Sequence, residues 1–414
     1  MTLLIYFTQT NMTRDPIISA ADRVQAMPQF RRALLAREAL IAGASKTVAF
    51  GPREGRLRRL LAATGRGGMV VVSLVLLLGR YFAGCRVATK KVMPEAIFLG
   101  IGAMREQMLR ADIQAQLGTE PHFVDELGAD GFAALPRPSL TQVIRHWMRA
   151  MHEALEIYSE PDPDFKPLDL LSTLTMRLHE LAYLLALFER LHETRPQLLI
   201  YSSTAGLAAY AACLAGFKVE YRQHGLLART LVFPEFCAMV ALTAFEGRYV
   251  ASRIHGLALR LNKPPAALTS LPKVFAFAGD YEAKDPSPVT ELAEVALVNG
   301  FHVIVRPHPR GHNNLWDDIR GRDGVDFDTD GRFEDFLGKW RPAFVASWIS
   351  TTLLDGLQMG AVPVTLSRDN RLLLLPIDTI AFSWPQQRAL IESIMRDSEE
   401  RQRAFESLSE NLQP

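Results

Sequence analysis

The chain has 414 residues, which is enough for two domains, and 48% of them are hydrophobic and 22% charged, as in proteins with a substantial core. The formal net charge is +1, so the charge balance gives no reason to expect a nucleic-acid partner. The three cysteines are far apart and lack CxxC spacing, which argues against a disulfide framework or a zinc site and fits a reducing compartment.

The N-terminal part has a first predicted strand at 3–8 that lacks the basic start and long apolar stretch of a signal peptide, so a cytoplasmic location is expected. Residues 53–66 contain five arginines and one glutamate. Two interpretations remain open for them: a solvated helix face, or a patch that contacts anionic lipid or an acidic glycan. Residues 69–78 are the most apolar run. They are too short to cross a bilayer and are predicted as a buried strand or helix, with shallow membrane contact as the alternative.

The rest of the first half alternates strand-like and helix-like segments. Strands are predicted at 47–51, 96–102, 197–201, 217–221 and 237–243, and helices at 30–44, 104–117, 140–158, 168–192 and 205–214. The paired prolines in residues 261–265 indicate a linker.

The second half repeats the alternation. Strands are predicted at 273–278, 301–305, 325–328, 343–347 and 362–366, and helices at 288–298, 332–339, 350–359, 385–396 and 399–409. The pattern predicts an α/β protein with two Rossmann-like doubly wound domains, 1–262 and 267–414, facing a cleft. The last helices are candidates for packing back on the first domain.

The segment from His302 to Arg310 is the most informative one for function. An apolar strand ends in Arg306-Pro307-His308-Pro309-Arg310, and proline stops strand pairing. Ligands bind at the carboxyl ends of strands in open α/β sheets, so Arg306, His308 and Arg310 are candidate phosphate ligands. His308 is also a predicted catalytic residue, because these groups can stabilise the negative charge of a leaving group.

Further candidates open a helix or follow a strand. Ser350, Thr351 and Thr352 open a predicted helix whose N–H groups suit a phosphate, and Asp355 lies one turn on. An ordinary helix cap explains the hydroxyls equally well.

In the first domain, a strand ends in Arg222, Gln223, His224 and Gly225, where His224 is a candidate base or phosphate ligand and the others are candidate cleft or acceptor contacts. The loop 123–132 holds three neighbouring carboxylates, whose mutual repulsion can raise a pKa, and Asp130 is the predicted catalytic base. A polar surface loop is the alternative.

These motifs resemble those of GT-B glycosyltransferases that build bacterial capsule, teichoic acid and lipopolysaccharide glycans, namely polysialyltransferases, capsular Kdo transferases and CDP-glycerol transferases. The shared features are His224-Gly225, Arg306-Pro307-His308-Pro309 and the cluster 350–352. Asp130-Gly131 resembles an acidic-acidic-Gly motif of the sialyl and Kdo enzymes, although its first acidic position is Ala129 here.

The resemblance implies a transferase that moves a sugar from a nucleotide donor, with CMP or CDP favoured, to a surface-polysaccharide or lipid-linked glycan acceptor. It also implies that no cofactor or metal is needed, in keeping with the lack of a DxD suited to a catalytic metal at a strand end. Peripheral contact with the inner face of the bacterial inner membrane is expected. Two alternatives stay open: a sugar-nucleotide 2-epimerase, and a non-catalytic nucleotide- or glycan-binding scaffold of a polysaccharide assembly complex.

Overall fold

The computed structural model describes residues 16–43, 52–86, 94–101, 104–126, 132, 134–228, 230–261, 272–280, 283, 285–308, 313–331, 333–348, 351–367, 377–410 and 412. Contacts divide the chain into two compact units: 1–222, 229–239 and 250–258 form the first, and 223–228, 240–249 and 259–414 form the second. The predicted strands at 3–8 and 47–51 and the predicted linker after residue 261 lie outside the described residues.

The first sheet has the strand order β2-β1-β3-β4-β5-β6 in the described chain. Strand β1 pairs in parallel with both β2 and β3, so the chain turns to the opposite side of β1 after β2. Such a reversal is the switch point at which open α/β sheets bind ligands, outside the carboxyl ends of the strands. The strands are Ala96–Gly100 (β1), His122–Asp125 (β2), Leu199–Ser202 (β3), Val219–Arg222 (β4), Ala238–Ala241 (β5) and Ala258–Leu261 (β6).

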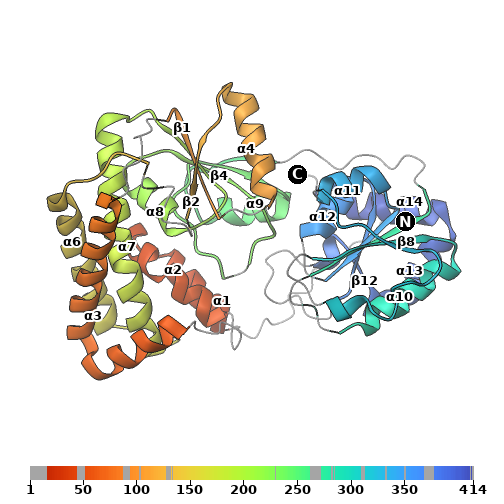
Figure 1. The fold of residues 1–414 in the computed structure, drawn as a ribbon, viewed down its shortest axis with the longest axis horizontal. Coiled ribbons are helices and arrows are strands. Elements are labelled where there is room, and N and C mark those ends of the chain that lie inside the picture. The colour runs from red at the N-terminus through yellow and green to blue at the C-terminus, as the bar shows by residue number, and fades with distance from the viewer. Residues whose placement is uncertain are drawn as a thin grey trace. The chain divides into compact units, whose positions relative to one another are not determined.

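Helices cover both faces of this sheet (Figure 1). On one face Phe98 packs with Ile113 of α4 and with Tyr201. A helical layer is built around α7, which begins with Pro167 at a position where its missing N–H is harmless, and which contacts α2, α3, α6 and α8. The helices are Pro16–Gln25 (α1), Gln29–Gly43 (α2), Pro52–Arg86 (α3), Met104–Leu117 (α4), Leu140–Ser159 (α6), Pro167–Thr194 (α7), Leu207–Leu214 (α8) and Ala244–Ala251 (α9).

Helix α3 decides between two expectations and corrects a third. The apolar run 69–78, predicted as a buried strand or helix, is helical and lies within a 35-residue helix that bends at Gly65. The run was predicted to be too short to cross a bilayer, but it belongs to the segment Ala63–Ala83, which is long and apolar enough by length and composition. The sequence pattern concealed the length of this segment because glycines flank the apolar run and Ser73 interrupts it, yet Ser73 is fully buried and its hydroxyl is hydrogen-bonded within the helix.

The second sheet has the order β12-β11-β10-β7-β8-β9, and its paired strands run parallel. Its switch point lies between β7 and β10. Phe275 of β7 stacks on Phe344 of β10, with ring centroids 5.5 Å apart, at the centre of the core. The strands are Val274–Ala278 (β7), His302–Arg306 (β8), Val325–Phe327 (β9), Phe344–Ser347 (β10), Val362–Thr365 (β11) and Phe382–Ser383 (β12).

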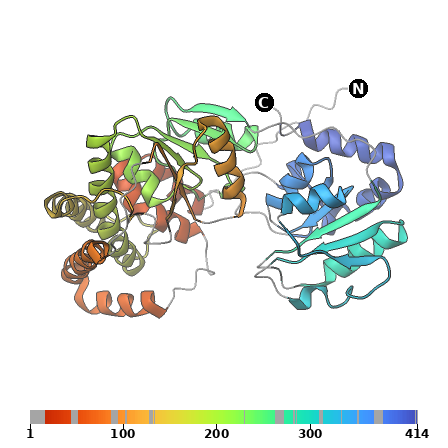
Figure 2. The same ribbon diagram turned by 45° about the horizontal axis from the view of Figure 1, so that its top comes forward.

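Helices cover both faces of the second sheet as well (Figure 2). Phe336 and Leu337 of α11 pack on one face, and Leu292 of α10 belongs to the larger core on the other. The last two helices add Ile391 and Phe405 to that larger core. The helices are Ser287–Val298 (α10), Phe333–Trp340 (α11), Thr351–Gln358 (α12), Trp384–Arg396 (α13) and Ser398–Glu410 (α14), with 3₁₀ turns at Asn313–Trp316 (η1) and Ile377–Thr379 (η2). The predicted class, an α/β protein with two doubly wound parallel sheets, is confirmed.

Candidate functional site

A carboxylate on a half-buried residue lies at the switch point of the first sheet. Glu126 directly follows β2, and its backbone N–H donates to the carbonyl of Gly100 at 2.7 Å, which extends the pairing of β2 with β1. The hydroxyl of Thr204, in the loop after β3, donates to Oε1 of Glu126 at 2.8 Å. A Cβ atom on Gly206, which precedes α8, would lie 1.8 Å from Oε2. A larger residue at 206 would therefore displace this carboxylate from its place at the start of α8.

Its surroundings raise the pKa of the Glu126 carboxyl from 4.5 to about 7. Burial is the main cause, and the nearby charges of Glu180 and Glu106 act in the same direction. The Thr204 hydrogen bond and the charge of Arg177 oppose them. A carboxyl group with such a pKa is partly ionised at neutral pH, as a general base requires.

A second carboxylate, that of Glu106, fixes the loop after β1. It is buried and accepts the Ile101 N–H at 3.0 and 3.1 Å and the Ser203 hydroxyl. A Cβ atom on Gly100 would come within 2.7 Å of it. Because backbone and hydroxyl donors hold Glu106, we assign it a structural role and regard Glu126 as the carboxylate suited to chemistry.

The loop after β4 holds His224-Gly225 and is anchored by a buried residue, Glu246. The carboxylate of Glu246 accepts the Leu227 N–H at 2.7 Å and the side-chain amide of Gln223, also at 2.7 Å. Burial raises the pKa of this carboxyl group. Thr243 and Glu246 also form a reciprocal cap at the start of α9. Gln223, predicted as a cleft residue, therefore supports the loop.

This loop brings two predicted motifs together within the second unit. A Cβ atom on Gly225 would lie 3.4 Å from Oγ1 of Thr351, the first residue of α12. His224 is half-buried beside it. The other predicted residue of this segment, Arg222, belongs to the first unit, where it is buried, forms an ion pair with Glu220 and donates to Gln116 at 2.8 Å.

The loop after β8 approaches the end of β7 very closely. A Cβ atom on Gly279, the residue after β7, would lie 2.4 Å from the backbone nitrogen of His308 and 3.1 Å from the carbonyl carbon of Pro307. Any other residue at 279 would push this loop away. His308 is thereby held half-buried at the carboxyl end of β7, beside the switch point. Gly279 was not predicted from the sequence, and only its place after an apolar strand hinted at it.

Arg306 is tied to the loop after β9. Its guanidinium donates to the carbonyls of Asp330, at 2.7 Å, and Gly331, and lies over the ring of Phe336. The same loop is held by Asp328, whose carboxylate accepts from Lys339 and Trp340 at 2.7 and 2.6 Å.

These two hydrogen bonds lower the pKa of Asp328 to about 2. Asp328 is thus an anchor of the second unit. Direct donor binding by Arg306 stays a prediction.

The remaining predicted residues fall into two groups. Thr351, Thr352 and Asp355 lie on the first turns of α12, at the carboxyl edge of β10. Asp130, Arg310 and Ser350 lie outside the described residues. Within the described part of the chain, no group of three or more His, Cys, Asp or Glu side chains is arranged to hold a metal ion.

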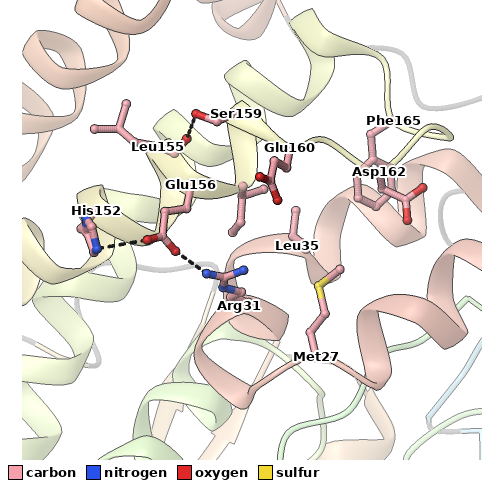
Figure 3. Close-up of a pocket in the computed structure, with 11 residues that line it drawn as sticks. Met27, Arg31, Leu35, His152, Leu155, Glu156, Ser159, Glu160, Asp162 and Phe165 are labelled. Atoms are coloured by element: carbon pink, nitrogen blue, oxygen red, sulfur yellow. Dashed lines mark hydrogen bonds and ion pairs between the residues drawn. The ribbon is translucent and has the colours of Figure 1, made fainter.

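A cavity of about 500 Å³ lies apart from these strand ends, in the helical layer of the first unit (Figure 3). Arg31 of α2 crosses it and forms ion pairs with Glu153, at 2.8 Å, and Glu156 of α6. His152 also contacts Glu156, at 3.2 Å. None of the predicted site residues lines it, and Arg31, which crosses it, is held by ion pairs, so we interpret it as a packing feature between helices.

No family model matches the chain, and no curated protein matches its sequence. Several solved glycosyltransferase structures resemble it. Os79 from O. sativa, in complex with UDP and deoxynivalenol-3-glucoside, is 11% identical, with 77% of this chain and 95% of that one covered and a TM-score of 0.44.

SnogD from Streptomyces nogalater is 15% identical, with 76% and 95% covered and a TM-score of 0.37. SsfS6 from Streptomyces sp. SF2575, complexed with thymidine diphosphate, is 14% identical, with 76% and 96% covered and a TM-score of 0.40. Similarity at this level carries no functional assignment.

Proposed function

We propose that this protein is a glycosyltransferase that moves a sugar from a nucleotide-activated donor to a glycan or lipid-linked acceptor. The observation that carries the proposal is the close approach of the His308 loop to Gly279 at the switch point of the second sheet. It leaves a histidine and the N-terminus of α12 at one edge of a doubly wound sheet. Both groups suit a negatively charged phosphate.

In this proposal the second unit binds the donor. The His308 side chain and the hydroxyls and N–H groups of Thr351 and Thr352 hold the phosphates. They also stabilise the negative charge that develops when the bond between the sugar and the phosphate oxygen breaks. These groups supply the neutralisation without requiring a metal, as the sequence resemblance implies. Activity that survives chelation by EDTA is the corresponding expectation.

A carboxylate acts as the base in this proposal. The acceptor hydroxyl attacks the anomeric carbon, the bond to the phosphate breaks, and the nucleotide leaves with the electron pair. The hydroxyl proton passes to the carboxylate of Glu126, whose pKa of about 7 matches this task. Asp130 and His224 remain the sequence-based candidates for the same role.

Donor and acceptor classes follow from the sequence motifs. A CMP- or CDP-linked donor and a surface-polysaccharide acceptor are what the resemblance to capsule and teichoic acid enzymes favours. A cytoplasmic site of action fits a soluble nucleotide donor.

The test is release of free nucleotide from a panel of CMP-, CDP-, UDP-, GDP- and dTDP-sugars, in the presence of bacterial lipid extract as acceptor. Glu126→Gln should lower kcat by about 10²- to 10⁴-fold, the usual contribution of a general base, while leaving donor binding intact. Glu95→Gln, at an exposed glutamate before β1, is the matched control and should keep full activity.

Turnover of one donor that Glu126→Gln abolishes supports the proposal. Nucleotide binding without turnover of any donor would instead favour the scaffold alternative. Interconversion of two nucleotide sugars without nucleotide release would favour the epimerase.

A further inference from the structure

Helix α3 presents two different faces along its second segment, residues 66–86. Met69, Ser73 and Leu77 recur every four residues and are fully buried. This face packs on α7 and α6: Arg80 pairs with Glu180 at 3.1 Å, and the Trp147 indole N–H donates to the Ser73 hydroxyl at 3.2 Å. One side of the helix is therefore part of the protein core.

The opposite face is exposed and apolar. Val71, Val75 and Phe82 are 61%, 62% and 52% exposed and lie on one stripe of the helix, because they are four and seven residues apart. Every exposed residue from 67 to 83 is uncharged: Gly67, Val71, Val75, Gly79, Phe82 and Ala83. From Val71 to Phe82 the stripe extends for about 16 Å at 1.5 Å per residue. Soluble proteins rarely leave such a continuous apolar strip in water.

The other notable property of α3 is its charge. The helix sequence contains seven arginines and one glutamate, and four of the arginines precede the bend at Gly65. Arg59, in that first segment, is exposed. Each basic residue near an anionic membrane surface contributes about 1 kcal/mol of binding. A cationic segment joined to an apolar stripe has the composition of helices that lie in the plane of a membrane interface.

The packing of α3 favours docking on a membrane surface over crossing the bilayer. Ala63–Ala83 is apolar enough to span, with a mean hydropathy of 1.5. A span would have to give up the contacts of the buried face and place Arg80, now paired with Glu180, in hydrocarbon. Docking through the exposed stripe would leave all of these contacts in place.

We propose that the exposed stripe of α3, Val71, Val75 and Phe82, is a docking surface for an anionic phospholipid bilayer, with Arg59 of the first segment against the lipid phosphates. The proposal concerns where the protein works and is independent of the transferase activity.

The test is vesicle co-sedimentation of the full chain. The probes are vesicles of phosphatidylcholine mixed with phosphatidylglycerol and vesicles of phosphatidylcholine alone. The wild type should bind the anionic vesicles, and bind them more weakly in high salt. Val75→Glu should weaken that binding by about tenfold or more, since it places a charge in the apolar stripe. Val298→Glu is the matched control, because Val298 ends α10 in the second unit and is 86% exposed.

Three results would overturn the proposal. The wild type would fail to sediment with anionic vesicles, Val75→Glu would bind as well as the wild type, or Val298→Glu would lose as much binding. Light scattering without vesicles tests the alternative that a second copy of the chain covers the stripe. A dimer that Val75→Glu dissociates, together with no vesicle binding, would assign the stripe to a second copy of the chain. Thermal melting of both variants should match the wild type, because both positions are exposed.

Discussion

Replacing Glu126 by glutamine measures how much unfolding free energy is lost when the carboxylate at the switch point of the first sheet ionises. The pKa of Glu126 is about 7 in the folded protein, against an ordinary value of 4.5. A raised pKa means that this group stabilises the fold fully below pH 4.5 and that the stabilisation is lost as pH rises through about 7. At 1.36 kcal/mol per pH unit, 7 − 4.5 corresponds to about 3 kcal/mol of unfolding free energy.

Glutamine does not ionise in this range, so the unfolding free energy of the variant lacks this pH-dependent decrease. The difference in unfolding free energy between Glu126→Gln and the wild type should shift in favour of the variant by about 3 kcal/mol between about pH 4 and pH 8. Urea unfolding followed by circular dichroism at a series of pH values measures it. Any fixed effect of losing the Thr204 hydrogen bond cancels, since only the pH dependence is used. A difference that stays constant with pH, or an equal shift in the exposed control Glu95→Gln, would refute the reasoning.

Three further substitutions test the supports of the site. Gly279→Ala should lower the free energy of unfolding, measured by thermal unfolding, by about 1–3 kcal/mol and weaken nucleotide binding, because the new Cβ would lie 2.4 Å from a backbone atom. Gly338→Ala is the control: it lies in α11 with open space around it, so the substitution should be neutral or stabilising. Glu246→Gln should cost about 1–3 kcal/mol in urea unfolding, because its amide N–H₂ would meet buried donors, and an unchanged midpoint would contradict the anchoring role. Asp328→Asn should cost about 1 kcal/mol at pH 7, through the weakened contact with the exposed Lys339, and the cost should disappear as pH falls towards 2; a cost that persists there would contradict the pairing.

The repeating architecture could be predicted from the sequence because its signals are local. The apolar runs that became β7, β8 and β10 end at glycine, proline and serine, and the helices between them show the 3.6-residue period. The possible strand orders are then few, because consecutive strands are usually neighbours and crossovers between parallel strands are right-handed. Helix α3 was misjudged because its amphipathic character depends on which face the rest of the helical layer covers.

The position of the His308 motif could be predicted from the sequence, but the contacts that support it could not. The motif around His308 lies where the sequence indicated, at the carboxyl end of a parallel strand. The close contact that requires Gly279 is made between two loops distant in sequence, which periodicity does not reveal. The contacts of Glu126 with Thr204 and Gly206 are likewise made between loops distant in sequence. Glu246 was detectable, since Thr243-Ala-Phe-Glu246 is a capping-box pattern.

Nucleotide binding by the second unit is the most direct test of the transferase proposal. Thermal shifts with CMP, CDP, UDP, GDP and dTDP should be compared for the wild type, His308→Ala and His302→Ala. His302 begins the same strand β8 at its opposite end, where it contacts Asp326 at 3.1 Å, so it is a matched control. The proposal predicts that one nucleotide stabilises the wild type and His302→Ala, and binds His308→Ala about 10- to 100-fold more weakly. A folded wild type that no nucleotide stabilises, or equal stabilisation of all three proteins, would contradict it.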